Sequence, residues 1–137
     1  MKTRLAIAQD STSVIALWQA CGLTRPWNDP QHDFKFAVEG PSSCVLVLES
    51  GEQIVATVMV GHDGHRGAVY YLAVMPDQQR KGFGKLIHEA AVNWLRSKAV
   101  WKINLMFRNG NAQVKGFYET LGYEINEVVS LGKRIDG

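Results

Sequence analysis

One stretch decides how this chain folds: Val74-Met75-Pro76-Asp77-Gln78-Gln79-Arg80-Lys81-Gly82-Phe83-Gly84-Lys85-Leu86. Before it, residues 68–74 are rich in β-branched and aromatic residues, which favour a strand. Pro76 has no backbone N–H to donate, so that strand should end just before it. After the stretch, apolar residues recur at helical spacing and would form one helix face: Phe83, Leu86, Ile87, Ala90, Ala91, Trp94 and Leu95. The stretch therefore predicts a strand, a loop and a helix in succession.

The predicted loop has the composition of an anion-binding site. It carries three basic residues, Arg80, Lys81 and Lys85, and two glycines, Gly82 and Gly84, where the helix begins. The first amides of a helix have no intrahelical partners, and the helix N-terminus carries a partial positive charge. Glycine lets an anion approach these amides closely because it has no Cβ. The loop therefore predicts a bound phosphate group.

Two common nucleotide-binding motifs are excluded at this loop. A P-loop would need Gly at the position of Gln79 and Ser or Thr at that of Leu86. A Rossmann fingerprint would need Gly or Ala at Ile87 and an acidic residue about 20 positions further on, where residues 101–106 contain none. The phosphate ligand must therefore belong to another class.

Length and composition set the wider limits. The chain has 137 residues, of which 46% are hydrophobic, so we expect a single domain over residues 1–137. A formal net charge of +2 does not favour a nucleic-acid partner. The apolar run within residues 1–8 is too short for a signal sequence or a membrane span, which predicts a soluble cytoplasmic protein. Cys21 and Cys44 lack metal-type or redox-type spacing and are expected to be reduced core residues.

The hydrophobic periodicity predicts strands that alternate with helices. Strands are expected over residues 4–8, 43–49, 53–60, 68–74 and 102–107, with one or two more over 123–134. Helices are expected from a cap at Asp10 or Ser11 to Gly22, from a cap at Asp29 through Val38, from Phe83 onward, and over residues 114–121. The resulting order, β-α-α-β-β-β-α-β-α-β-β, indicates an α/β fold with a mixed sheet.

Two segments resemble the signatures of one family. The pattern Gln79-x-x-Gly82-x-Gly84, after a strand that ends at Val74, resembles the acyl-CoA pyrophosphate loop of the GNAT superfamily of N-acyltransferases. Residues 111–123 resemble its second signature, in which Asn111 opens a helix that carries Tyr118 and ends in Gly-aromatic. The resemblance covers nearly the whole chain and implies a mixed, mostly antiparallel central sheet flanked by helices. Leu17-Trp18 and three further segments, 25–30, 63–67 and 130–134, also resemble YpeA-type bacterial acetyltransferases.

The resemblance implies acetyl-CoA as the cosubstrate and no metal. The residues expected to bind it are Leu72, Ala73, Val74, Gln79, Arg80, Lys81, Gly82, Phe83, Gly84, Lys85 and Asn111. The main chain of residues 72–74 would pair with the pantetheine arm like an added strand, and the amides of residues 80–85 would bind the pyrophosphate. Asn111 would hydrogen-bond the arm, and Tyr118 would protonate the departing thiolate. The alternative for Tyr118 is a core aromatic at helical spacing.

Two loops supply candidates for the acceptor site. Trp27 and Asn28 lie in an unusual segment between two prolines and would form a wall against the acceptor, or else Trp27 fills the edge of the core. Asp63 and His65, with Arg66 beside them, lie in a glycine-rich turn and would touch the acceptor, or else form a solvated turn tip. A metal site at the histidines of this turn is not favoured, because no third ligand has suitable spacing.

The sequence leaves the general base unassigned. No glutamate lies in residues 68–74, where the resemblance implies a base, so Asp63, His65 and Glu39 are the candidates. A lysine-like amine with a pKa of about 10.4 is neutral in only about one molecule in two thousand at pH 7. An α-amine with a pKa near 8 needs little more than about 1 kcal/mol to lose its proton. The missing glutamate therefore slightly favours an acceptor amine of low pKa.

Two functional hypotheses follow. The first is an N-acetyltransferase that moves an acetyl group from acetyl-CoA to a primary amine of a small molecule or of a peptide or protein N-terminus. Direct attack is expected, since neither cysteine lies near the motifs in the sequence. The second is an acyl-CoA-binding or interaction module on the same fold without transfer activity. No nucleic acid or membrane is expected as a partner, and the chain is expected to be a monomer or a homodimer.

Overall fold

The computed structural model describes all 137 residues, which group into an N-terminal unit, Met1–Leu105, and a C-terminal unit, Met106–Gly137. The elements in chain order are β1 (Lys2–Leu5), η1 (Ala8–Asp10), α1 (Ser11–Ala20), α2 (Pro30–Glu39), β2 (Ser43–Ser50), β3 (Gln53–His62), β4 (Gly67–Val74), η2 (Pro76–Gln78), α3 (Phe83–Ser97) and α4 (Ala112–Thr120). Here η1 and η2 are short 3-10 helices.

The N-terminal unit is built on a four-stranded sheet in the order β1-β2-β3-β4, with every neighbouring pair antiparallel. β2 and β3 form a hairpin around the turn at Gly51, as the two apolar runs predicted. A second hairpin joins β3 to β4, whose register begins with His62 opposite Gly67. The predicted α/β class with a largely antiparallel sheet is confirmed.

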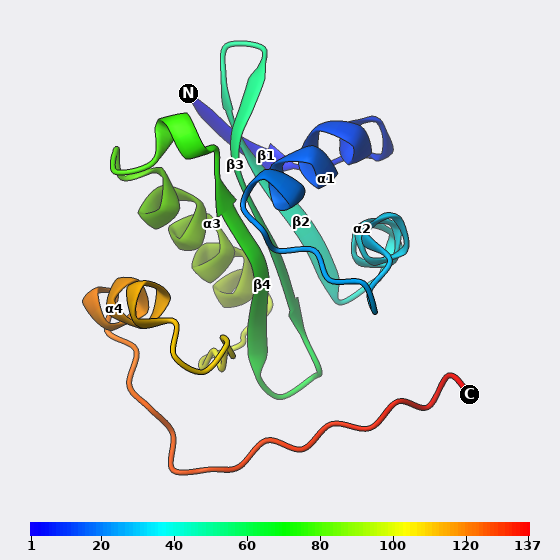
Figure 1. The fold of residues 1–137 in the computed structure, drawn as a ribbon, viewed down its shortest axis with the longest axis vertical. Coiled ribbons are helices and arrows are strands. Elements are labelled where there is room, and N and C mark those ends of the chain that lie inside the picture. Colours follow the sequence, from blue (N-terminus) through cyan, green and yellow to red (C-terminus); the bar gives the residue numbers. More distant parts are fainter. The chain divides into compact units, whose positions relative to one another are not determined.

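Helices cover both faces of this sheet: α3 lies on one side, and α1 and α2 lie on the other (Figure 1). The alternation along β2 explains the two layers, because successive side chains of a strand point to opposite faces. Cys44, Leu46 and Leu48 join the apolar cluster that contains α3, whereas Val45 and Val47 join the cluster that contains α1 and α2. Both faces of the sheet are therefore core.

The helix boundaries follow the predicted signals. The carboxylate of Asp29 accepts the backbone N–H groups of Gln31 and His32 at 3.0 and 3.2 Å, which caps α2. The Asn111 side chain accepts the N–H of Val114 at 3.1 Å and caps α4. Gly22, which follows α1, has a left-handed backbone with φ of 69°, a conformation that glycine adopts without strain.

The first strand is shorter than predicted: β1 ends at Leu5 rather than at Ala8. The Asp10 carboxylate accepts the Ile7 N–H at 2.8 Å and the Arg4 guanidinium at 2.7 Å, so the chain turns into η1 instead of remaining extended. The neighbouring Arg4 guanidinium also keeps the pKa of the Asp10 carboxyl below its usual value. The local hydrogen bond between Asp10 and the Ile7 N–H therefore ends the strand, although a weak alternation of apolar side chains continues to Ala8.

Two segments that were predicted to contain strands contain none. In residues 102–107 only Ile103 makes a bridge, parallel to Gly67, although Ile103 and Leu105 do pack against the core as their alternation predicted. Residues 123–134 contain no strand, and from Glu124 to the C-terminus every residue is exposed. Alternation reports which side of a segment can be buried, but a strand also needs a paired neighbour along its length.

The C-terminal unit contains one helix, α4, and a small group of aromatic rings around Tyr118. The Tyr118 ring lies 5.1 Å from Phe117, 5.4 Å from Tyr123 and 6.4 Å from Phe107, measured between centroids. Only 9% of Tyr118 is exposed. Gly122 follows α4 with φ of 92°, so the helix ends where the sequence predicted.

Candidate functional site

The loop after β4 folds back onto the end of its own strand. The Val74 carbonyl accepts a hydrogen bond from the Gln79 side-chain amide at 3.2 Å. The Gln78 N–H donates to the Met75 carbonyl at 2.8 Å within the η2 turn. The loop is therefore ordered by its own contacts and leads directly into α3.

The N-terminus of α3 differs from those of α2 and α4 because no side chain caps it. Gly82 is the capping residue, with φ of 83°, and Arg80 two residues earlier is also left-handed, with φ of 65°. A Cβ placed on Gly82 would meet no heavy atom within 4 Å, so the helix end is open to a ligand. The first backbone amides of α3 have no capping side chain, and Gly82 leaves space beside them, so an anion can bind there.

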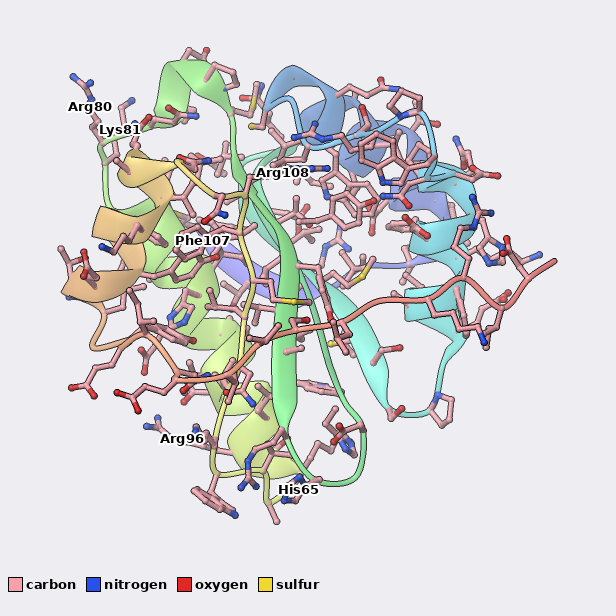
Figure 2. All side chains as sticks on the ribbon, turned by 60° about the horizontal axis from the view of Figure 1, so that its bottom comes forward. His65, Arg80, Lys81, Arg96, Phe107 and Arg108 are labelled. Atoms are coloured by element: carbon pink, nitrogen blue, oxygen red, sulfur yellow. The ribbon has the colours of Figure 1, made fainter.

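Three cations surround this helix end without a carboxylate partner. Arg80, Lys81 and Lys85 are exposed and make no salt bridge in the chain. Lys81 instead donates to the Gln78 side-chain oxygen at 3.1 Å. Arg80 and Lys81 project from one end of the N-terminal unit (Figure 2). The positive charge of the loop is therefore available to a phosphate ligand.

One edge of β4 is open for most of its length. β3 pairs along one side, and on the other side only Gly67 is bridged, with its N–H donating to Lys102 and its carbonyl accepting from Asn104, each at 2.9 Å. Beyond Gly67, residues 68–74 have no strand beside them on that edge. An extended ligand can pair with such an edge through main-chain hydrogen bonds.

A bulge interrupts β4 in its middle. Thr57 pairs with Ala73 and Met59 with Tyr70, so Tyr71 and Leu72 together lie opposite Val58 alone. Tyr71 has a φ of 52°, a left-handed conformation that is rare for a bulky side chain and costs about 1–3 kcal/mol. The surrounding contacts must therefore stabilise it.

Two side chains from the covering helices hold Tyr71 in this conformation. Its ring stacks on that of Trp18 in α1, with centroids 4.0 Å apart and an interplanar angle of 12°. Its hydroxyl donates to the Asp33 carboxylate in α2 at 2.8 Å. Burial, and secondarily the Asp33 carboxylate, raise the pKa of Tyr71 to about 12. The bulge is thus linked to both helices on that face.

Comparison with known proteins identifies the family. The acetyltransferase (GNAT) family model matches residues 5–123. The chain belongs to the GNAT family of acetyltransferases. An acetyltransferase of Yersinia pestis (strain Pestoides F) is 40% identical over 135 residues, which cover 98% of this chain and 96% of that protein.

Solved structures show the same GNAT fold. AAC(6')-Iy, in complex with the bisubstrate analogue CoA-S-monomethyl-acetylneamine, matches with a TM-score of 0.82 at 13% identity, covering 98% of both chains. A predicted acetyltransferase of Clostridium acetobutylicum, solved with acetyl-CoA, matches with a TM-score of 0.79 at 15% identity over 96% of this chain and 95% of that one. At these identities the likeness concerns the fold. No helix of this GNAT chain is long and apolar enough to cross a bilayer.

The predicted acceptor candidates of this GNAT protein fall in two separate loops. Asp63 uses its carboxylate within the β3–β4 turn, where Oδ1 accepts the N–H groups of His65 and Arg66 at 2.8 and 2.7 Å. These bonds hold the pKa of Asp63 below its usual value, which makes it a poor base. His65 is exposed and lies at the end of the N-terminal unit opposite to Arg80 and Lys81 (Figure 2).

The α1–α2 loop is ordered by Arg25. The Arg25 guanidinium donates to the carbonyls of Gly22 and Thr24 at 2.7 and 3.0 Å, and the Asn28 N–H donates to the Arg25 carbonyl at 3.0 Å. Trp27 is 60% exposed, so most of its side chain lies outside the core. Its exposed ring remains a candidate wall for an acceptor.

Asn111 and Tyr118 both belong to the C-terminal unit. The Asn111 side-chain oxygen accepts the Val114 N–H in its cap. Burial raises the pKa of Tyr118 to about 12, so its hydroxyl stays protonated at neutral pH. Glu39, the third candidate base, is exposed at the end of α2, and no group of three or more His, Cys, Asp or Glu residues is arranged to bind a metal.

Sequence reasoning missed two features of this site. It placed both cysteines away from the motifs, but the Cys21 thiol donates to the Val74 carbonyl at 3.2 Å, because α1 ends over the end of β4. Burial raises the pKa of this thiol, which keeps it protonated. It also missed Asp33, which resembles any acidic residue in the first turn of a helix, where the dipole favours it.

Proposed function

We propose that this GNAT protein transfers an acetyl group from acetyl-CoA to a primary amine by direct attack of the amine on the thioester. The observation that carries the proposal is the N-terminus of α3, which no side chain caps, which follows Gly82, and near which Arg80, Lys81 and Lys85 make no salt bridge. The amides of residues 80–85 would bind the pyrophosphate, and the three cations would neutralise the phosphate charges.

The open edge of β4 would take the pantetheine arm. The Val74 carbonyl already accepts from Gln79 and Cys21, so the arm would pair mainly with the main-chain groups of Leu72 and Ala73. The bulge at Tyr71 bends the strand immediately beyond these residues. The arm would therefore end beside the bulge, where the thioester meets the amine.

Tyr118 and Asn111 are included in this proposal because they match the second GNAT signature. A phenol with a pKa of about 12 is a weaker acid than a thiol with a pKa of about 8.5, so full proton transfer to the free thiolate would be unfavourable by about 5 kcal/mol. Tyr118 would instead donate a hydrogen bond that stabilises the negative charge as it develops on sulfur. Asn111 would position the arm.

The acceptor is proposed to be a small-molecule amine or a peptide or protein N-terminus. The structure favours none of the three candidate bases, because Asp63 is engaged in its turn and His65 and Glu39 are exposed. An α-amine with a pKa near 8 could react through a water relay with little cost. The resemblance to YpeA-type acetyltransferases supports the same reaction class.

The test combines calorimetry with an assay of thiol release. The purified protein is expected to bind CoA and to release thiol from acetyl-CoA only when a suitable amine from a screened panel is present. Tyr118→Phe should lower the rate by about a hundredfold or more while CoA affinity stays within about twofold. CoA binding without thiol release across the panel would favour the alternative, a binding module, and the absence of CoA binding would overturn the proposal.

A further inference from the structure

We propose that Asp33, positioned by Tyr71, binds a second cationic group of the acceptor, so that the acceptor is a primary amine carrying another positive charge away from the reacting nitrogen. The inference rests on the proposed transfer reaction and assigns the acceptor class. Asp33 lies in α2, on the face of the sheet opposite α3.

Asp33 differs from the other half-buried carboxylates of the N-terminal unit in its hydrogen-bond partner. Three carboxylates of this unit are half-buried, namely Asp10, Asp33 and Glu49. Asp10 and Glu49 both accept hydrogen bonds from Arg4, at 2.7 and 2.6 Å. Asp33 accepts only from the neutral hydroxyl of Tyr71, at Oδ2, and has no cationic partner. The dipole of α2 and the Tyr71 hydroxyl favour the negative charge of Asp33, and a cationic ligand would add a charge-assisted hydrogen bond to this carboxylate.

The geometry of Tyr71 links this carboxylate to the reaction site. Tyr71 bears the strained left-handed backbone of the bulge, immediately before Leu72 and Ala73 on the proposed coenzyme edge. Its side chain reaches away from the main chain to Asp33 and stacks on Trp18 along the way. The carboxylate is therefore separated from the β4 main chain by the length of one tyrosine side chain.

This separation decides which nitrogen Asp33 binds. A carboxylate beside an ammonium group raises the pKa of that group and keeps it protonated, which would block attack on a thioester. The reacting amine must lose its proton, so Asp33 is suited to the distant cation and not to the nucleophile. Asp33 is the titratable partner of Tyr71 from α2, and the α1 segment STSVIALWQA, whose Trp18 stacks on Tyr71, contains no titratable residue.

The test uses matched acceptors that differ in one charge. Lysinamide and norleucinamide share a reacting α-amine of low pKa, and only lysinamide carries a second, distant ammonium group; each is assayed with acetyl-CoA by thiol release. With the wild-type protein we expect a KM at least about tenfold lower for lysinamide than for norleucinamide. Asp33→Asn should raise the KM for lysinamide by about tenfold, leave kcat within about threefold and leave the KM for norleucinamide unchanged.

Two further variants separate recognition from folding. Tyr71→Phe retains the ring and its stacking on Trp18 but removes the hydroxyl that positions Asp33, and it should raise the lysinamide KM by a smaller factor than Asp33→Asn. Glu52→Gln, in the β2–β3 turn, removes one exposed negative charge as the control and should change neither KM. CoA affinity, measured by calorimetry, reports an intact fold in all variants.

Each outcome has one meaning. Equal KM values for the two amines, an Asp33→Asn effect that is the same for both, or transfer to other amines of the panel but to neither of these two, would overturn the role of Asp33 while leaving acetyl transfer in place. Transfer to neither amine, nor to any other in the screened panel, would instead be a failure of the proposed function. A loss of CoA affinity in Asp33→Asn would assign the residue a structural role and would also overturn the inference.

Discussion

The loop that follows β4 and the bulge within β4 are neighbours in the sequence but are built in different ways. The loop consists of consecutive residues, and its properties come from main-chain conformation: the left-handed Arg80 and Gly82 and an uncapped helix end. The bulge depends on side chains from three elements, because Tyr71 of β4 is held by Trp18 of α1 and Asp33 of α2. A site of the first kind is visible in a short sequence pattern, whereas a site of the second kind appears only after folding.

This difference predicts that core substitutions will affect the two regions unequally. Trp18 is fully buried, stacks on Tyr71 and also contacts Phe34, with ring centroids 6.3 Å apart. Trp18→Ala should lower the free energy of unfolding by about 3–5 kcal/mol, because it leaves a cavity and frees Tyr71. Thermal or urea unfolding measures the loss, and CoA affinity well below the melting temperature should change little.

Trp18→Phe is the matched control for the cavity. It keeps an aromatic ring against Tyr71 and removes the indole Nε1, which is buried without a hydrogen-bond partner. The loss of stability should then be no more than about 1–2 kcal/mol, since no satisfied hydrogen bond is broken. Equal losses in the two variants would mean that ring stacking does not stabilise the bulge, and the contrast between the regions would disappear.

A substitution in the loop after β4 should instead change the affinity for CoA more than the stability of the fold. Gly82→Val places a β-branched side chain at φ of 83°, which costs about 1–2 kcal/mol of stability. A Cβ at this position meets no heavy atom within 4 Å, so we expect the added side chain to crowd chiefly a bound phosphate. The Kd for CoA, measured by calorimetry, should rise by about tenfold or more.

Gly82→Asn separates backbone strain from crowding in this experiment. Asparagine tolerates the left-handed conformation better than valine does, so stability should be nearly retained. Its side chain still occupies the open space, and CoA affinity should fall to an intermediate value. If Gly82→Val binds CoA with wild-type affinity, the N-terminus of α3 is not part of the coenzyme site, whatever the effect of the substitution on stability.

The same contrast explains what the sequence could predict. Asp29, Asn111 and Gly22 act within one turn of chain, and each helix boundary that they signalled is present. The strand predicted at residues 102–107 failed because pairing depends on a distant neighbour, and only Ile103 has one. Tyr71 was visible as an aromatic residue in a strand, but its left-handed backbone follows from the register against Val58, which no local pattern encodes.

The acceptor side shows this limit most clearly. Asp63 and His65 were candidates because titratable groups in a glycine-rich turn are typical of sites, yet Asp63 serves to hold that turn together. Asp33 was not a candidate, since an acidic residue in a helix's first turn has an ordinary explanation in the helix dipole. Its absence of a cationic partner becomes evident only when Arg4 is seen to pair with Asp10 and Glu49.

The smallest expected effect concerns two tyrosines whose pKa values are raised for different reasons. Burial alone raises the pKa of Tyr118 to about 12, whereas for Tyr71 the hydrogen bond and charge of Asp33 add to burial. Asp33→Asn should therefore lower the pKa of Tyr71 by part of its shift, with burial keeping it above the usual value of about 10, and leave that of Tyr118 unchanged. NMR titration of tyrosines labelled at Cζ measures both.

The raised pKa values of Tyr71 and Tyr118 also make the stability of the fold depend on pH. Both phenols have a folded pKa above the unfolded value, so their contribution is fully present below about pH 10 and is lost as the pH rises toward about 12. Unfolding measured across this window should show decreasing stability, with a weaker decrease in Asp33→Asn because one raised pKa has moved down. An unchanged Tyr71 titration in that variant would show that Asp33 does not act on the phenol, and the bulge would then be stabilised by stacking alone.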